Sequence, residues 1–278
     1  MKKLTKPDTG SAILKSRRFL RCGLALMFAA VALTSCQTTK KGNRRKNKHA
    51  AVGNRNYASS ADISTQRPGP ATGPLGRQNG YSSVPTTAQV VALTFDDGPH
   101  PSNTPRVLDI LRSRNAKATF FVTGENARKY PAILQRIVRE GQEIGNHTMT
   151  HGRITKMSTS QIRNEIIGTH QAVKSATGIL PRSFRPPYGS ITPEQKEWIK
   201  REYGMPSIMW SVDPEDWKKP GVSVVTSRLV NGAARGGILL LHDIHASSID
   251  ATPATLDELK RKGYQFVTIS QLISLEGR

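Results

Sequence analysis

Two adjacent carboxylates follow an apolar run in the chain, at a place where they could share one reaction. Residues 90–95 are apolar or β-branched, which predicts a buried strand, and Asp96 and Asp97 come directly after it. Gly98 and Pro99 then predict a turn. Ligands of α/β proteins collect at the carboxyl ends of strands. Two acids there can divide the work, one binding a metal ion and the other moving a proton; the alternative is a solvated acidic turn.

Two histidines four residues apart offer further metal ligands. His147 and His151 would share one face if their segment formed a helical turn. With Asp97 they would make a set of two histidines and one carboxylate, which leaves coordination positions open for water, as a reaction site requires. Alone, two histidines at this interval are more often surface or core residues than metal ligands.

A rigid segment that begins at Arg185 reads Arg-Pro-Pro-Tyr-Gly and ends at Gly189. Each residue before a proline is pushed away from helical conformation, so this loop can be fixed in one shape. Such a loop can aim a backbone N–H at a developing oxyanion, and Arg185 can hold a neighbouring carboxylate in its charged form. The alternative is a structural turn with a solvated arginine.

Two later segments add acids, an aromatic ring and a third histidine. Asp213, Asp216 and Trp217 follow an apolar run, and the tryptophan could offer a platform to a sugar ring or simply pack in the core. His242 ends the apolar run that contains Leu240. A histidine at this place can act as a general acid near neutral pH, although an isolated one would be read as a satisfied core histidine.

The elements that must position these residues alternate along the chain from residue 89 onward. The patterns predict strands at 90–95, 118–122, 182–185, 207–212, 237–242 and 265–269, and helices at 104–113, 133–139, 160–175, 192–203, 223–229 and 254–262, with 143–145 leading into a loop. This alternation predicts a parallel sheet or barrel. The 278 residues suffice for one or two domains with a sizeable core.

The N-terminus carries an export signal. Basic residues up to Arg21 precede an apolar run at 23–33, which is short for a membrane span and is typical of a signal peptide. The run ends in Leu-Thr-Ser-Cys36, which resembles the bacterial lipobox and implies cleavage before Cys36 and acylation of its thiol. The alternative is an ordinary signal peptide or an uncleaved anchor. We therefore expect a signal peptide at 1–35 and an exported, lipid-anchored protein of the bacterial cell envelope.

Most of the positive charge lies outside the expected folded domain. The formal net charge is +21, of which only +7 falls on residues 89–278. Residues 36–88 are rich in basic, small and polar residues and predict a disordered basic linker. No nucleic-acid motif accompanies the charge, so we expect no nucleic-acid partner; a basic tether fits an anionic membrane or wall polymer. The sequence leaves the oligomeric state open.

Taken in order, the five segments around Asp96, His147, Arg185, Asp213 and His242 resemble the polysaccharide deacetylases of carbohydrate esterase family 4, the NodB-like domain. The resemblance covers roughly residues 88–274. It implies a distorted or incomplete (β/α) barrel, here a single catalytic domain at 89–278, with one divalent metal ion, usually zinc.

The resemblance also assigns roles. It implies that Asp97, His147 and His151 are the metal ligands and that Asp96 is the base, positioned by Arg185. His242 would be the acid that protonates the leaving amine. Asp216 would adjust the acidity of His242, and Asp213 is the less favoured candidate for that role.

The other implied roles are supporting ones. The Tyr188 N–H would be an oxyanion donor, and Thr148 would brace the metal loop. Trp217 and Leu240 would line the groove.

The implied activity is hydrolysis of N-acetyl groups on N-acetylglucosamine residues of a β-linked polysaccharide. Peptidoglycan is the favoured substrate, because an envelope tether meets it first. Chitooligosaccharide, poly-N-acetylglucosamine and acetylxylan remain alternatives within the enzyme class. A non-catalytic glycan-binding envelope protein is the alternative from another class.

Overall fold

The computed structural model describes residues 74–278 of the chain. The expected signal peptide, Cys36 and most of the expected linker lie outside these described residues. Within them, no helix combines the length and the apolarity needed to cross a membrane.

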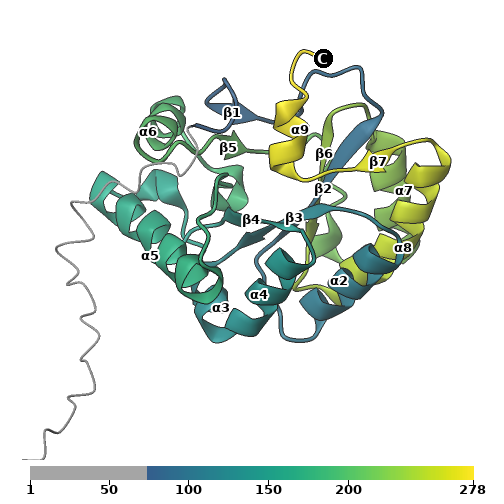
Figure 1. The fold of residues 1–278 in the computed structure, drawn as a ribbon, viewed down its shortest axis with the longest axis horizontal. Helices are drawn as coiled ribbons and strands as arrows, with labels where there is room; N and C mark the ends of the chain where they lie inside the picture. The colour runs from purple at the N-terminus through teal and green to yellow at the C-terminus, as the bar shows by residue number, and fades with distance from the viewer. Residues whose placement is uncertain (1–73) are drawn as a thin grey trace, which may run out of the picture. The chain divides into compact units, whose positions relative to one another are not determined.

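The described residues are built around one parallel five-stranded sheet, with β2 inside it (Figure 1). Its strands are β2 (Val90–Asp96), β3 (Ala118–Val122), β4 (Glu143–Asn146), β6 (Gly237–His242) and β7 (Gln265–Phe266). The order is β4-β3-β2-β6, and β7 pairs with the first residues of β2. Every residue of β2 is buried, which explains its nearly continuous apolar sequence.

The sheet curls but does not close. Strand β1 (Gly80–Tyr81) pairs with β5 (Ser207–Ile208) as a separate two-stranded piece. Single-residue bridges at Phe184 continue from β4 to β5, and another joins Val212 to Leu239 of β6. The fold is thus an incomplete (β/α) barrel, and the expected fold class is confirmed.

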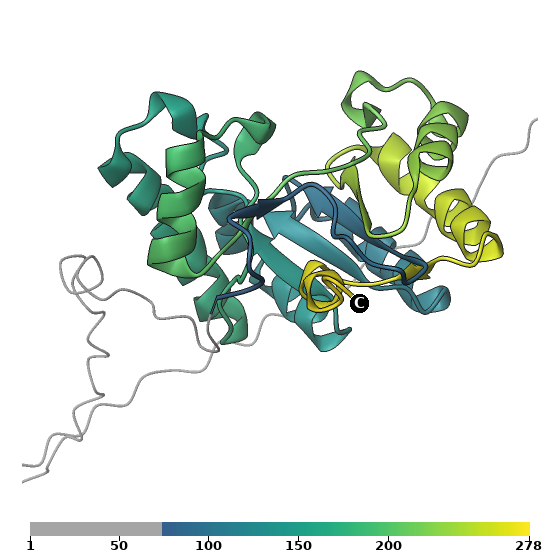
Figure 2. The ribbon, with the colours of Figure 1, turned by 90° about the horizontal axis from the view of Figure 1, so that it is seen from above.

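Helices cover the outside of the strands (Figure 1). They are α2 (Asn103–Ser113), α3 (Gly124–Lys129), α4 (Pro131–Arg139), α5 (Thr159–Thr177), α6 (Pro193–Tyr203), α7 (Val222–Gly232), α8 (Ala246–Arg261) and α9 (Ile269–Ser274). Figure 2 shows the α5–α6 region and the α7–α8 region on opposite sides of the sheet. Apolar faces of α2, α4, α7 and α8 share a core cluster with β2, β3 and β6.

Several expected elements differ from the structure. Residues 143–146 form strand β4, where we expected no strand but only a stretch leading into a loop. The expected strand at 182–185 is reduced to the bridge at Phe184, and the one at 207–212 ends at Ile208. The expected strand at 265–269 stops at Phe266, because Thr268 begins α9 with a capping box.

Helix α8 begins eight residues before the expected start at 254, and Pro253 lies inside it. Proline cannot donate the helical hydrogen bond, so a proline within the sequence of α8 does not by itself signal a helix that continues on both sides of it. Helix α3 was not expected.

The folded part also begins before residue 89, the expected boundary. Leu75, Tyr81 and Val84 are buried. The Tyr81 hydroxyl accepts from the backbone N–H groups of Arg77 and Gln78 and donates to Glu276 at 2.9 Å. This segment has few apolar residues and therefore resembles the linker in composition. Those few residues nevertheless pack in the core.

Candidate active site

The carboxyl ends of the strands bring the predicted site residues to one cavity. Asp96 ends β2, His147 follows β4 and His242 ends β6. The cavity has a volume of about 450 Å³. Its lining includes Asp96, Asp97, His147, His151, Tyr188, Asp213, Trp217, Leu240 and His242, together with Pro186, Trp210 and His245. Arg185 and Asp216 lie behind this lining and bind Asp96 and His242 of it, and Thr148 is buried beside His147 in the chain.

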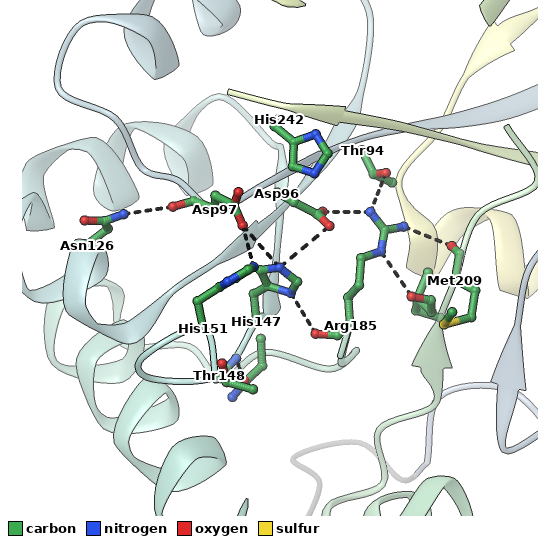
Figure 3. A network of polar contacts seen from close by, with 12 residues as sticks. Thr94, Asp96, Asp97, Asn126, His147, Thr148, His151, Arg185, Met209 and His242 are labelled. Carbon is green, nitrogen blue, oxygen red and sulfur yellow. Dashed lines mark hydrogen bonds and ion pairs between the residues drawn. The ribbon is translucent and has the colours of Figure 1, made fainter. Parts of the chain in front are cut away.

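Asp97, His147 and His151 form a cluster able to hold a metal ion (Figure 3). The Nε2 atoms of His147 and His151 lie 3.3 and 3.1 Å from Asp97 Oδ1. Metal bonds of about 2.1 Å in tetrahedral geometry place ligand atoms about 3.4 Å apart, close to this spacing. The three side chains therefore converge as a ligand set.

The surroundings of the cluster fit a cation. His147 Nδ1 lies 2.7 Å from the Arg185 carbonyl oxygen, which holds that nitrogen as the donor and leaves Nε2 free as a ligand. Asp97 Oδ1 is buried and has no hydrogen-bond partner among the described residues. Burial would raise the pKa of Asp97, but the two imidazoles lower it well below its usual range. Two histidines and one carboxylate suit zinc.

The two histidines do not lie on the helical turn that would have put them on one face. They lie in a loop after β4, and both Thr148 (φ 65°) and His151 (φ 60°) are in the left-handed region. The N–H groups at the start of α3 bind the loop carbonyls, with Gly124 N donating to Thr148 O at 2.9 Å. Glu165 of α5 accepts from the N–H groups of residues 149 and 150, both at 2.8 Å. The unexpected helix α3 is thus part of the support for the metal loop.

Asp96 is held by the wholly buried Arg185 (Figure 3). Arg185 Nη1 donates to Asp96 Oδ1 and to the Thr94 hydroxyl, each at 2.7 Å. Its other nitrogens donate to the Ile208 and Met209 carbonyl oxygens at 3.0 Å. Burial lowers the pKa of the guanidinium while Asp96 acts in the opposite direction. All three guanidinium nitrogens of Arg185 thus donate hydrogen bonds, which hold its positive charge beside Asp96.

His242 is oriented by Asp216 and not by Asp213. His242 Nδ1 and Asp216 Oδ1 are 2.8 Å apart, and Asp216 Oδ2 accepts from the His242 N–H at 2.8 Å and from the Ser248 hydroxyl at 2.5 Å. Burial alone would lower the pKa of His242; the hydrogen bond and charge of Asp216, with smaller effects of nearby carboxylates, raise it to about 9. Asp213 lines the cavity, where its Oδ1 accepts from the Glu215 N–H.

The remaining predicted residues, Tyr188, Trp217 and Leu240, line the same cavity, the first two exposed and the third buried. Tyr188 is 60% exposed, with φ 60°, and its ring packs edge-on against His151 at 4.7 Å between centroids. Within the described residues, its backbone N–H has no hydrogen-bond partner. Trp217 is 51% exposed, and Leu240 is a buried part of the lining.

Sequence reasoning missed several supporting residues. Thr94 is a polar residue inside an apolar strand, and that interruption was a usable signal. Ser248, Asn126 and Asn146 carried no such signal: Asn126 donates to the Asp97 carbonyl oxygen at 2.8 Å, and Asn146 accepts from Thr148 N–H at 2.9 Å. Only the fold brings these side chains to the site.

An open barrel of parallel strands with a carboxylate and two histidines at its carboxyl end defines an α/β domain with a side-chain cluster that could hold a metal ion. The family described as polysaccharide deacetylase matches residues 83–208. The chain belongs to this family, carbohydrate esterase family 4.

Relatives and solved structures support the assignment. The chain is 45% identical over 186 residues to the peptidoglycan-N-acetylglucosamine deacetylase PgdA of Listeria monocytogenes, covering 67% of this chain and 39% of that one. It is 38% identical to the solved peptidoglycan deacetylase PdaC of Bacillus subtilis, with a TM-score of 0.64, covering 69% of this chain and 93% of that one.

A second similar solved structure is a family pseudoenzyme, BA3943 of Bacillus anthracis. It is 32% identical, with a TM-score of 0.65, covering 69% of this chain and 68% of that one. Membership of the family therefore does not by itself guarantee activity, which depends on the residues of the site.

Proposed function

We propose that this chain is a metal-dependent hydrolase that removes N-acetyl groups from N-acetylglucosamine residues of peptidoglycan. The observation that carries the proposal is the cluster of Asp97, His147 and His151, with Asp96 and His242 lining the same cavity. A metal-ligand set, a base and an acid are what hydrolysis of an unreactive amide needs.

Asp97, His147 and His151 would hold the ion, most suitably zinc, since imidazole and carboxylate ligands in this number leave open positions. When bound, a divalent cation supplies Lewis acidity to the acetamide carbonyl. The Tyr188 N–H has no hydrogen-bond partner among residues 74–278, so it can donate to the same oxygen as charge develops on it.

Asp96 would accept the proton of the attacking water. Its Oδ1 is bound by Arg185 at 2.7 Å, while its Oδ2 lies 3.8 Å from His147 Nε2 at the ligand cluster. The ion pair thus leaves one oxygen of the carboxylate facing the place where water would react.

His242 would donate the proton to the leaving nitrogen. Asp216 holds its Nδ1 at 2.8 Å, which directs Nε2 away from the partner. The same pairing raises the pKa of His242 to about 9, so the imidazole is charged and ready to donate at neutral pH.

The substrate class rests on the peptidoglycan deacetylases among the relatives and on the exposed rings of Tyr188 and Trp217 at the cavity, which can support sugar rings. The chain spans 39% of PgdA, so the shared part is the domain and not the whole of that enzyme. The alternative is a non-catalytic glycan-binding protein; the family does include a pseudoenzyme, BA3943.

Acetate release tests the proposal. The full chain, stripped of metal by chelation and then loaded with zinc, would be assayed on peptidoglycan, N-acetylglucosamine oligomers and acetylxylan. We expect release that needs zinc and is fastest on peptidoglycan. Zinc-loaded protein that binds glycan and releases no acetate from any substrate would support the binding-protein alternative. Faster acetate release from another substrate would make that polymer, and not peptidoglycan, the proposed substrate.

The location of the protein belongs to the same proposal. Peptidoglycan lies outside the cytoplasm, so the enzyme must be exported to the cell envelope. We propose a signal peptide at 1–35, a lipid anchor at Cys36 and a basic linker. The linker would end before Leu75, because this residue is buried in the folded domain.

A further inference from the structure

One buried carboxyl group beside the site has no part in the proposed chemistry. Asp243 follows His242, and its side chain is wholly buried. Its Oδ2 accepts from the Thr104 hydroxyl, whereas Oδ1 has no hydrogen-bond partner among the described residues. No lysine or arginine of residues 74–278 forms an ion pair with it. Because a buried carboxyl group without a cation lowers stability, its presence calls for a reason.

The position of Asp243 supplies that reason. Both carboxyl oxygens lie against Gly98, so close that a Cβ atom placed on Gly98 would collide with them. The backbone φ of Gly98 is not positive. This glycine is therefore required by the space that Asp243 fills and not by its own conformation.

Asp243 contacts the turn after β2 at two points and is linked to it at a third through Thr104. Its N–H donates to the Asp96 carbonyl oxygen at 3.3 Å, and its carboxyl group packs on Gly98. Through Thr104 it reaches the end of the turn, since the Thr104 hydroxyl accepts from the His100 N–H at 2.7 Å. The turn between these points carries Asp97.

Asp97 needs such support. Its φ of 74° is uncommon for a residue with a side chain and persists only where surrounding contacts enforce it. The Asn126 side chain holds the Asp97 carbonyl oxygen from one side. Asp243 and Thr104 hold the turn from the other.

We propose that Asp243 is a positioning residue: with Thr104 it fixes the 96–100 turn and so sets the placement of Asp96 and Asp97. The inference rests on the proposed function for its effect on turnover. Its effect on metal binding can be measured without any substrate. A misplacement of about 1 Å in a reaction site can cost about 10²-fold in rate.

The test compares Asp243→Ala and Asp243→Asn with Thr104→Val and Thr104→Ser in the full chain. Zinc affinity is measured by competition with a chromophoric chelator, kcat at saturating zinc by acetate release, and folding by thermal unfolding. Asparagine and serine keep the contact that alanine and valine remove. Thr255→Val is the matched control, because it deletes a buried hydroxyl that donates to Ala251 O at 2.9 Å within α8, away from the cavity.

We expect Asp243→Ala and Thr104→Val to weaken zinc binding by about tenfold and kcat by about 10- to 100-fold, in line with losses of supporting residues around metal ligands. In Asp243→Asn and Thr104→Ser, zinc affinity and kcat should each stay within about threefold of the values of the unaltered protein. Thr255→Val should lower the unfolding temperature without changing zinc affinity.

Unchanged zinc affinity and kcat in folded Asp243→Ala would overturn the proposal. If that variant does not fold, the Thr104 pair decides: equal zinc affinity in Thr104→Val and Thr104→Ser would overturn it. An unaltered protein that binds zinc but releases no acetate would contradict the proposed function alone, since the zinc titrations still report on the turn.

Discussion

At the scale of single residues, Asp96 and Asp97 are neighbours in sequence with separate partners. Asp96 pairs with Arg185 at 2.7 Å, and Asp97 faces His147 and His151. The positive φ of Asp97 turns the chain between them, so that the two carboxylates leave the backbone toward different groups. The equal size of the two side chains allows their roles to be separated by one substitution at each.

We expect Asp96→Asn to retain zinc and to lose about 10² to 10⁴ in kcat, because a general base is removed while the ligands stay. Asp97→Asn should lose zinc affinity first, and excess zinc should partly restore its activity. Zinc titration of both variants, followed by acetate release, makes the comparison. Loss of zinc in Asp96→Asn with retention in Asp97→Asn would mean that the two roles are exchanged.

The pairing of His242 with Asp216 predicts the alkaline limb of the pH profile. The acid works only while protonated, so activity should fall as the pH rises through the raised pKa of about 9. Asp216→Asn removes the carboxylate charge and the charged hydrogen bond that raise the pKa of His242. Burial, which lowers that pKa, remains. The alkaline limb of kcat/KM should then move to lower pH by about one unit or more.

Asp213→Asn is the control for that measurement, since Asp213 lines the same cavity and its Oδ1 binds the Glu215 N–H. Its alkaline limb should stay in place. A shift in Asp213→Asn and none in Asp216→Asn would assign the tuning role to Asp213.

At the scale of elements, helix α5 carries a buried group that links stability to pH. His170 is 5% exposed, neither ring nitrogen has a partner among the described residues, and its ring meets Tyr203 of α6 edge-on at 6.0 Å. Burial lowers its pKa from 6.5 to about 4. The folded state therefore favours the neutral ring.

The pKa of His170 is lower in the folded state than in the unfolded state. The contribution of the neutral ring to the free energy of unfolding is therefore fully present above pH 6.5 and is lost as the pH falls toward 4. Across that window the free energy of unfolding should fall by roughly 3 kcal/mol through this group. In His170→Phe, that part of the decline should disappear. Urea unfolding of both proteins from pH 7 to 4 makes the comparison, with Tyr203→Phe as the control that keeps the histidine. An equal decline in His170→Phe would show that other groups cause it.

The elements themselves differ in how well their sequences identify them. Helices α5 and α6 begin with capping boxes at Ser158 and Thr192 and end at glycines in the left-handed conformation, so local residues mark both ends. Helix α3 has six residues and no apolar face to signal it. The short strands β1 and β5 are set by pairing across the chain, which local patterns do not contain.

At the scale of the whole molecule, the site was largely predictable because parallel strands share a direction. Apolar runs that end in Asp96 and His242 place those residues at the same edge once the strands pair, and Asp96 is in register with His242. The loop geometry of His147 and His151 was not predictable, since it depends on α3 and on Glu165. Nor was Asp243, whose role appears only where its carboxyl group meets Gly98.

The final prediction concerns how this domain is held at its substrate. Cys36 closes the segment that resembles a lipobox, and the residues after it are basic. An acyl chain contributes about 0.8 kcal/mol per buried methylene group, and stable anchoring takes either a second chain or basic residues beside the first. Lipid and linker together would then keep the catalytic domain beside the wall polymer.

Cys36→Ser should abolish fatty-acid labelling and move the protein from the membrane fraction to the soluble fraction. Cys22→Ser is the matched control, because Cys22 lies inside the expected signal peptide and would leave with it. Its labelling and fractionation should match the unaltered protein. Acetate release by purified Cys36→Ser should be unchanged, since the cysteine lies outside the domain that carries the site. Labelling that persists in Cys36→Ser would contradict the anchor and leave an ordinary signal peptide or an uncleaved apolar segment as the explanation.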